Sequence, residues 1–205
     1  LKRRCARYPL QYLLRRQEFY GIDLVVFPRV KIPTASSETL VDQAVQVVGS
    51  KKLRVLDVGT GTGNLAVAIA MNCPEACVTA IDVSATAVAN ARVNVSRLGL
   101  RRRVAIVRGD FFRTTFRQAF DVIVSNPPYV DRSESSFLQP EVKYEPRSAL
   151  FYGSSGVAFI RRLLRYAPSI LRSQGWLIFE CGFSQASLIA SFLKGADFRI
   201  VRDCD

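Results

Sequence analysis

The chain has 205 residues, of which 49% are hydrophobic, and this length and composition fit one globular domain with a substantial core. Its formal net charge of +12 favours an acidic partner such as RNA, a ribosomal complex or a polyanionic protein surface, although a basic surface without a dedicated partner fits the same charge. The five cysteines occur without any histidine, which argues against a metal site and favours reduced thiols in the cytoplasm. No apolar run in the sequence approaches the roughly 18 residues of a membrane span.

Residues 1–35 are predicted to form a basic N-terminal segment. Lysines and arginines far outnumber acidic residues there, so the segment presents either a solvated basic face or a docking surface for something negative, such as the ribosome or a nucleic acid. Within it, residues 19–26 predict two short strands that turn near Gly21. Because the chain begins at Leu1 rather than at a methionine, we expect a fragment or a processed form.

From residue 36 onward the sequence predicts alternating helices and strands. A helix capped by Ser36 or Ser37 carries an apolar stripe and ends at Gly49. Further helices are predicted at 65–71, 84–98, 156–171 and 185–193, with Pro168 shortening or kinking the third of these. Strands are predicted at 53–58, 77–81, 104–107, 122–124, 176–179 and 198–201. Apolar strands separated by amphipathic helices predict a doubly wound α/β fold, with a mainly parallel sheet covered on both faces.

A glycine-rich turn follows the first strand of this alternation. It runs from Asp57 through Gly59, Thr60 and Gly61 to Gly63. Alternate glycines let the backbone turn sharply and approach a ligand closely, ahead of a helix N-terminus. The acid precedes the glycines, and the last glycine stands at 63, where the dinucleotide-binding pattern would place one at 64. A carboxylate there would repel a pyrophosphate but attract an ammonium or sulfonium group, which favours S-adenosyl-L-methionine over NAD.

Two further acids follow the next two predicted strands. Asp82, with Val83 beside it, stands where a carboxylate can accept both hydroxyls of a ribose. Asp110, followed by Phe111 and Phe112, offers an acceptor for an adenine amine beside an apolar wall. Each acid alone is more often a surface or capping residue. Because the carboxyl ends of parallel strands converge on one crevice, these acids and Asp57 together predict an S-adenosyl-L-methionine site.

The stretch Asn126-Pro127-Pro128-Tyr129 follows the strand predicted at 122–124. Two consecutive prolines end strand pairing and hold the residue before each of them extended, so that backbone carbonyls can point outward. An amide, rigid carbonyls and an aromatic ring make a clamp for a planar nitrogen group. The alternative is that the stretch is only a proline-rich end of a strand, with no functional role. We predict these four residues as the catalytic group, with Asn126 also adjoining the cofactor, and expect no metal ligand.

On these motifs the chain resembles the HemK/PrmC family of release-factor glutamine methyltransferases. The resemblance covers nearly the whole chain and rests also on residues 9–12, 18–21, 144–150 and 180–182 with Gln185. It implies the seven-stranded-type sheet of class I S-adenosylmethionine-dependent methyltransferases, with residues 36–205 as the methyltransferase domain of a cytoplasmic enzyme of translation termination. It also implies methyl transfer to the side-chain amide nitrogen of a glutamine in the Gly-Gly-Gln loop of a peptide chain release factor. Asn126 and the Pro127 carbonyl would hold that amide, and Tyr129 would stack on it.

The sequence departs from the family pattern in three places. Residues 32–38 read Ile-Pro-Thr-Ala-Ser-Ser-Glu where the family has Ile-Pro-Arg-Pro-Glu-Thr-Glu, so we expect the contacts of this arm to differ. The family's N-terminal helical domain, implicated in holding the protein substrate, has no counterpart in these 205 residues. Because the sequence ends at Asp205, the last antiparallel strand of the family's sheet is expected to be missing.

Two other functions stay open on the sequence. The same clamp serves amino methyltransferases that act on RNA, DNA or a ribosomal protein, and the charge of +12 supports that alternative. The other is a non-catalytic binding module that keeps the fold after the change in the arm at residues 32–38. A hydrolase is excluded more firmly, because the sequence has no Ser/His or Cys/His pair and no metal-ligand cluster.

Overall fold

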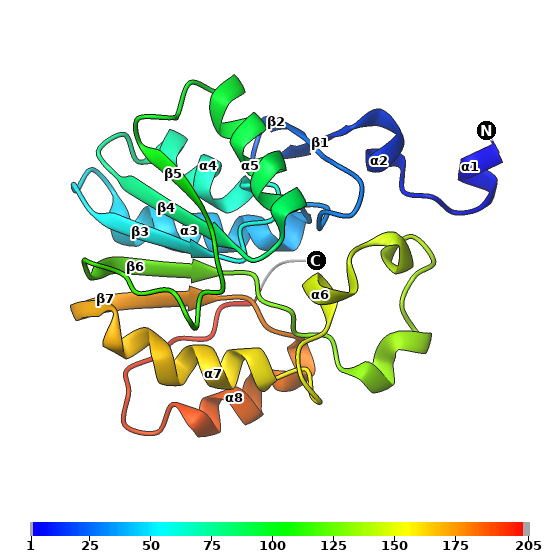
Figure 1. Cartoon of the computed structure of the whole chain (residues 1–205). Coiled ribbons are helices and arrows are strands. Elements are labelled where there is room, and N and C mark those ends of the chain that lie inside the picture. Colours follow the sequence, from blue (N-terminus) through cyan, green and yellow to red (C-terminus); the bar gives the residue numbers. More distant parts are fainter. Residues whose placement is uncertain (1, 203–205) are drawn as a thin grey trace.

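The computed structural model describes residues 2–202 as a parallel sheet with helices on both faces (Figure 1). Within these residues the sheet has five strands in the order β5-β4-β3-β6-β7, and each neighbouring pair is parallel. The strands are β3 (Arg54–Val58), β4 (Cys77–Asp82), β5 (Val104–Arg108), β6 (Phe120–Ser125) and β7 (Leu171–Phe179). The doubly wound α/β prediction is therefore confirmed, with five strands described in place of the seven-stranded type.

The buried strands divide their side chains between two cores, because successive residues of a strand face opposite sides of the sheet. Val55 packs in the core that contains α3 (Glu38–Val48) and α4 (Asn64–Asn72), with α5 (Ala85–Arg97) beside them. The next residue, Leu56, packs in the core on the other face together with Leu163 of α7 (Ala158–Tyr166). The helix α8 (Ala186–Phe192) packs against α7 (Figure 1).

Two predicted boundaries shift in the structure. The helix predicted at 156–171 is confined to α7, and Pro168 lies in the short 3₁₀ helix η4 (Ala167–Ser169) that follows it. The prediction that this proline shortens the helix is confirmed, since proline lacks the N–H that a longer helix would need. The strand β7 then begins at Leu171 rather than at residue 176.

The strand predicted at 198–201 does not form in the described part of the chain. Phe198, Ile200 and Val201 are each about half exposed, so this short apolar run neither pairs with β7 nor enters the core. Among the described residues, no strand pairs with this run, and a local pattern does not reveal whether a neighbouring strand will accept it.

The N-terminal segment contains α1 (Lys2–Cys5), α2 (Leu10–Leu14) and the antiparallel hairpin of β1 (Arg16–Phe19) and β2 (Ile22–Val25). The hairpin is confirmed, with its first strand starting three residues earlier than predicted, whereas the two short helices were not predicted. Tyr20 and Gly21 both have positive φ angles, 54° and 69°, as a tight two-residue hairpin turn requires.

The hairpin is fastened to the main sheet domain by buried amides of α5. Asn94 accepts a hydrogen bond from the Val25 N–H at 2.8 Å and donates one to the Val25 carbonyl at 2.9 Å. Asn90 accepts from the Phe27 N–H at 2.7 Å and donates to the same Val25 carbonyl at 2.8 Å. These contacts fix the path of residues 25–27, which lead into the candidate site.

Between β6 and α7 the chain makes a long excursion through η2 (Arg132–Ser136), η3 (Val142–Tyr144) and α6 (Arg147–Leu150). This excursion contacts the N-terminal segment, because the Tyr144 hydroxyl donates to the Ala6 carbonyl at 2.8 Å and Arg7 pairs with Glu141 at 2.8 Å. A further 3₁₀ helix, η5 (Phe183–Gln185), precedes α8. Among residues 2–202 no helix has the length and apolar character needed to cross a membrane.

Candidate active site

The candidate site lies where the order of the strands reverses. The chain proceeds from β3 to β4 and β5 toward one edge of the sheet and then returns to β6, which pairs with the other side of β3. Loops that leave the ends of β3 and β6 therefore diverge and open a crevice, the usual ligand position in open α/β sheets. Val58 is opposite Ser125 in register, and the Ser125 hydroxyl donates to the Val58 carbonyl at 2.9 Å. A cavity of about 370 Å³, within the usual range for ligand pockets, opens at this point.

The glycine-rich turn forms one wall of the cavity. The N–H groups of Gly59 and Thr60 donate to the Ile81 carbonyl at 2.9 and 3.1 Å, and the Gly61 N–H donates to Asp82 at 2.9 Å. Gly59, Thr60 and Gly61 line the cavity, whereas Gly63 lies behind the turn against α5. Gly63 has a φ of +83°, and a Cβ there would stand 3.1 Å from the Cβ of Ala91. Only glycine fits the start of α4 at this close approach.

Asp57 lies below the turn and does not line the cavity. Its carboxylate is fully buried, Oδ2 accepts a hydrogen bond of 2.6 Å from the Thr60 hydroxyl, and Oδ1 has no hydrogen-bond partner among the described residues. Burial raises the pKa of Asp57 to about 7, while the hydrogen bond from the Thr60 hydroxyl opposes that rise. The sequence placed Asp57 at the ligand itself, and the structure places it one layer beneath.

The two other predicted acids both line the cavity. Asp82 accepts from the backbone N–H groups of Gly61 and Ser84 at 2.9 and 2.8 Å, and burial raises its pKa. The exposed side chain of Val83 follows it at the rim. Asp110 accepts from the Phe112 N–H at 2.9 Å, and Phe111 is buried beside it.

Three aromatic side chains extend the apolar wall beside Asp110, and of these the sequence predicted Phe112 but not Tyr152 or Phe159. Phe112 lies with its ring centroid 5.0 Å from that of Phe159 and 6.3 Å from that of Tyr152, and all three line the cavity. Phe112 was visible next to Phe111, but Tyr152 and Phe159 belong to a segment with no motif of its own.

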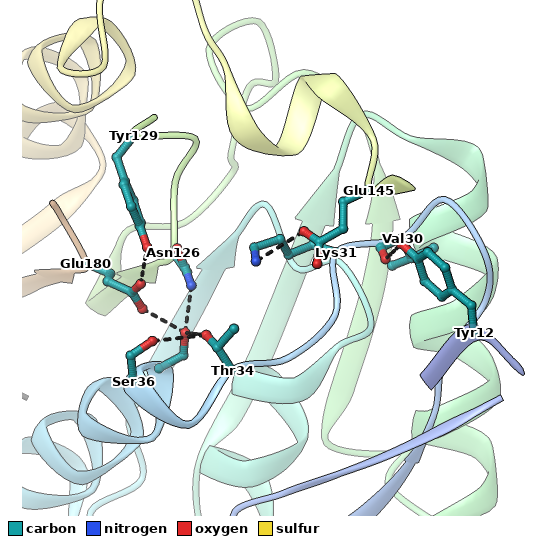
Figure 2. A network of polar contacts seen from close by, with 10 residues as sticks. Tyr12, Val30, Lys31, Thr34, Ser36, Asn126, Tyr129, Glu145 and Glu180 are labelled. Atoms are coloured by element: carbon teal, nitrogen blue, oxygen red, sulfur yellow. Dashed lines mark hydrogen bonds and ion pairs between the residues drawn. The ribbon is translucent and has the colours of Figure 1, made fainter. Parts of the chain in front are cut away.

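The predicted clamp is assembled at the opposite wall. Asn126, Pro127 and Pro128 line the cavity, and Pro127 is buried while Asn126 is half-buried. Tyr129 does not line the cavity; its hydroxyl donates to Glu180 at 2.7 Å. Figure 2 shows Tyr129, Glu180 and Asn126 joined in one network of polar contacts.

Residues 29–34 and 146–152 close the cavity from a third side. Lys31 pairs with the buried carboxylate of Glu145 at 3.2 Å, and the buried hydroxyl of Tyr12 donates to the Val30 carbonyl at 2.7 Å (Figure 2). Sequence reasoning assigned no role to these residues. The one indication in the sequence that these residues belong to the site was that Tyr12 and Glu145 lie in the stretches that carry the family resemblance.

The helix α3 departs from one prediction at this site. The sequence predicts a serine cap, but neither Ser36 nor Ser37 makes a side-chain cap hydrogen bond, and the 3₁₀ turn η1 (Ala35–Ser37) precedes the helix instead. The Ser37 hydroxyl is buried and directed to Asn126 and Glu180. Ser37 therefore belongs to the site, which the sequence missed because serine at a helix start is ordinarily a cap.

Comparison with known proteins defines the class of protein first. A family model described as "Methyltransferase small domain" matches residues 25–144. Among solved structures, the fold resembles the catalytic domain of hMettl16 in complex with MAT2A 3′UTR hairpin 6, with a TM-score of 0.70, 16% identity and coverage of 89% of this chain and 69% of that one. It also resembles a ribosomal protein L11 methylase from Lactobacillus delbrueckii subsp. bulgaricus, with a TM-score of 0.59, 21% identity and coverage of 82% and 72%. At these identities the likeness concerns the fold.

Sequence relatives then identify the particular family. A release factor glutamine methyltransferase from Geobacter sulfurreducens is 42% identical over 197 residues, covering 96% of this chain and 68% of the relative. The enzymes of the same name from Bordetella pertussis and Salmonella typhimurium are 40% and 36% identical, covering 97% and 100% of this chain and 74% and 73% of the relatives. The chain belongs to the release factor glutamine methyltransferase family.

Proposed function

We propose that this protein transfers a methyl group from S-adenosyl-L-methionine to the side-chain amide nitrogen of a glutamine in the Gly-Gly-Gln loop of a peptide chain release factor. Family membership supports both the reaction class and the acceptor. One structural observation carries the proposal: the same cavity is lined by the glycine turn with Asp82 and by Asn126 with its two prolines. A methyl donor and an amide acceptor can therefore meet there.

The cofactor half of the site would consist of residues at the ends of β3, β4 and β5. Asp82 would accept the ribose hydroxyls, with the N–H groups of Gly61 and Ser84 holding its carboxylate in place. Asp110 and Phe111 would receive the adenine, with Val83 at the rim. Gly59, Thr60 and Gly61 offer backbone close to the ligand, and the carboxyl group of buried Asp57 lies beneath them. A cationic ligand suits this arrangement better than a pyrophosphate does.

When bound, the cofactor supplies a methyl group on a positively charged sulfur. The acceptor nitrogen of a glutamine is a poor nucleophile, because its lone pair is delocalised into the carbonyl. The Asn126 side-chain oxygen and the Pro127 carbonyl would accept the two amide protons and orient the nitrogen, which is where most of the acceleration would arise. On accepting this methyl group the nitrogen would release one of its two protons, which the Asn126 oxygen and the Pro127 carbonyl would hold by hydrogen bonds until it passes to solvent. Stacking of Tyr129 on the amide stays a prediction, with its hydroxyl held by Glu180.

The test is to incubate the purified protein with methyl-labelled S-adenosyl-L-methionine and, in parallel, with release factor, with a release factor whose Gly-Gly-Gln glutamine is changed to alanine, and with tRNA. We expect label on the unchanged release factor alone. Label on tRNA alone would overturn the proposed acceptor and favour a nucleic-acid methyltransferase. Failure to bind the cofactor at millimolar concentration in a calorimetric titration would instead favour a non-catalytic binding module.

A further inference from the structure

A partly buried chain of hydrogen bonds joins Asn126 to Ser37, which also lines the cavity, and through Ser37 to Glu180. The Asn126 Nδ2 atom donates to the Ser37 hydroxyl at 2.6 Å, and that hydroxyl donates to Glu180 Oε2 at 2.7 Å. The other oxygen of Glu180, Oε1, accepts from the Tyr129 hydroxyl at 2.7 Å. The network joins the loop after β6, the start of α3 and the residue that follows β7 (Figure 2).

The count of protons in this network fixes its direction. A carboxylate accepts hydrogen bonds and donates none, so both hydroxyls that reach Glu180 must give it their protons. The Ser37 hydroxyl has a single proton and donates it to Glu180. In its contact with Asn126 it can therefore only accept a hydrogen bond. The Asn126 group that faces Ser37 must therefore be the NH₂ end of the amide, because an amide oxygen would meet a lone pair there.

We propose that Ser37 and Glu180 are positioning residues that lock the Asn126 amide with Oδ1 presented to the cavity as a hydrogen-bond acceptor. The inference deepens the proposed function, on which it rests. A primary amide can rotate by half a turn at little cost in shape, and the flipped form would present NH₂ to an acceptor amide that itself needs acceptors. The Ser37–Glu180 pair makes the flipped form unfavourable before any substrate binds. The Asn126 amide dipole is therefore preorganised for the acceptor.

The fold gives up a local contact to make this arrangement. Ser37 occupies the cap position of α3, where a serine side chain would ordinarily bind a backbone N–H of the first turn and stabilise the helix. Its side chain makes no such bond. The residue is only 1% exposed, and its remaining acceptor position faces the Thr34 hydroxyl at 3.2 Å. Its hydrogen-bonding capacity is directed to the site and the adjoining arm.

The experiment compares Ser37→Ala with a matched control, Ser36→Ala. Ser36 lies in the same turn and has a hydroxyl contact with Thr34 at 3.0 Å, but no contact with Asn126 or Glu180 is found for it. With release factor as substrate, we expect Ser37→Ala to lower kcat by up to about 100-fold. Its affinity for S-adenosyl-L-methionine, measured by calorimetry, should stay within about twofold of wild type, because the hydroxyl contacts Asn126, Glu180 and Thr34 rather than the glycine turn, Asp82 or Asp110. Ser37→Thr restores the hydroxyl and should recover most of kcat.

Glu180→Gln provides a second route to the same result. The Ser37 and Tyr129 hydroxyls reach different oxygens of Glu180, and a glutamine places an NH₂ group at one of these two positions, so in this geometry it can accept from only one of them. We expect a fall in kcat comparable to that of Ser37→Ala, again with little change in cofactor affinity. If both Ser37→Ala and Glu180→Gln keep the kcat of Ser36→Ala while remaining folded by circular dichroism, the inference is wrong and the proposed function stands.

A spectroscopic measurement tests the orientation of the Asn126 amide separately from the activity of the protein. The side-chain NH₂ of Asn126 gives a pair of proton–nitrogen correlation peaks, which can be assigned by their loss in Asn126→Asp. We expect these peaks to shift in Ser37→Ala and in Glu180→Gln but to stay in place in Ser36→Ala. Unshifted peaks in Ser37→Ala would overturn the inference whatever the substrate is. Absence of release-factor methylation by the wild type, by contrast, would overturn the proposed function alone.

Discussion

Asn126 acts, in our proposal, through a single oxygen atom. That atom is useful only if three conditions hold together: the loop after β6 places it at the cavity, the amide is turned the right way, and a neighbouring carbonyl can accept the second proton. The register of β6 with β3 meets the first condition, the Ser37–Glu180 pair the second, and the rigid Asn126-Pro127 peptide the third. In this proposal, hydrogen-bond acceptors orient the substrate amide and no strong base is needed. The absence of histidine from the sequence agrees with this.

Asn126→Ala is predicted to keep cofactor affinity and to lose turnover by about 100-fold or more, because it removes a hydrogen-bond acceptor that matters chiefly in the transition state. Steady-state kinetics with release factor and calorimetry with the cofactor measure the two quantities separately. Asn72→Ala is a suitable control, since Asn72 lies at the end of α4, where its amide donates to the Ala68 carbonyl. A fully active Asn126→Ala protein would remove Asn126 from the mechanism.

Asp57 makes the stability of the protein depend on pH. Its pKa is raised to about 7 in the folded state from an ordinary value near 4, so between these two pH values the folded protein binds more protons than the unfolded chain. Stability must therefore fall as the pH rises through that window. The whole effect of one such group is at most about 4 kcal/mol.

Asp57→Asn is predicted to remove that dependence, because the amide stays neutral and its oxygen can still accept from Thr60. In urea unfolding followed at several pH values, the variant should gain stability relative to wild type as the pH rises from about 4 to 7. Asp197→Asn, at an exposed aspartate, controls for the loss of one negative charge. A constant difference between variant and wild type across this range would contradict the prediction.

At the scale of the elements, the loop that carries Tyr129 is held by a close approach of backbones. A Cβ at Gly156 would stand 2.4 Å from the Tyr129 carbonyl and 2.5 Å from Nε2 of Gln185. The same Gln185 atom donates to the Tyr129 carbonyl at 2.6 Å, so Gly156 leaves room for the contact that joins η5 to the loop. The glycine before α7 is thus required by a distant loop and not by its own turn.

Gly156→Ala is predicted to destabilise the fold by roughly 1–3 kcal/mol, because a backbone carbonyl must move to admit the methyl group. Urea unfolding measures the loss. Gly182→Ala is the matched control, since its nearest neighbour at 3.3 Å is a side-chain atom of Gln185, which can yield, and its backbone is extended. Equal stability of the Gly156→Ala protein and the control would show that the loop accommodates the methyl group.

For the molecule as a whole, the cavity is completed by segments that are remote in sequence. The sheet supplies the floor, the N-terminal segment contributes residues 29–34, and the excursion after β6 contributes residues 146–152. The ion pair of Lys31 with the buried Glu145, which directly precedes the second of these segments, joins the two segments (Figure 2). Burial raises the pKa of Glu145, and Lys31 opposes that rise.

Lys31→Met is predicted to lower the free energy of unfolding at neutral pH by roughly 1–3 kcal/mol, because it leaves the buried Glu145 carboxylate without its cation. The deficit should shrink as the pH falls and the carboxylate gains a proton. The double variant Lys31→Met with Glu145→Gln should recover much of the loss, since no buried charge remains. Equal loss in the single and double variants, measured by urea unfolding, would contradict this account.

Much of the architecture could be predicted because local sequence patterns determine it. Apolar strands alternating with amphipathic helices, together with acids and glycines at strand ends, predicted the parallel sheet and the crevice, and the structure brings Asp82, Asp110 and Asn126 to one cavity. The clamp residues were found for the same reason, since two prolines after a buried strand leave few conformations to the chain. The prediction of a strand at 198–201 was wrong, because strand pairing depends on a partner strand and not only on the residues of the run.

By itself, then, the sequence determined the strand ends and the chemistry placed on them, because periodicity, turn residues and proline act within a few positions. Only the tertiary structure decided which way those groups face. Ser37 contacts Asn126, which is 89 positions away in the sequence, and Glu180, which is 143 positions away. Glu145 and Lys31 are likewise distant in the sequence and form an ion pair. Such contacts leave no periodic trace, because a buried serine or glutamate acquires its role from whichever partner the packing of distant segments brings to it.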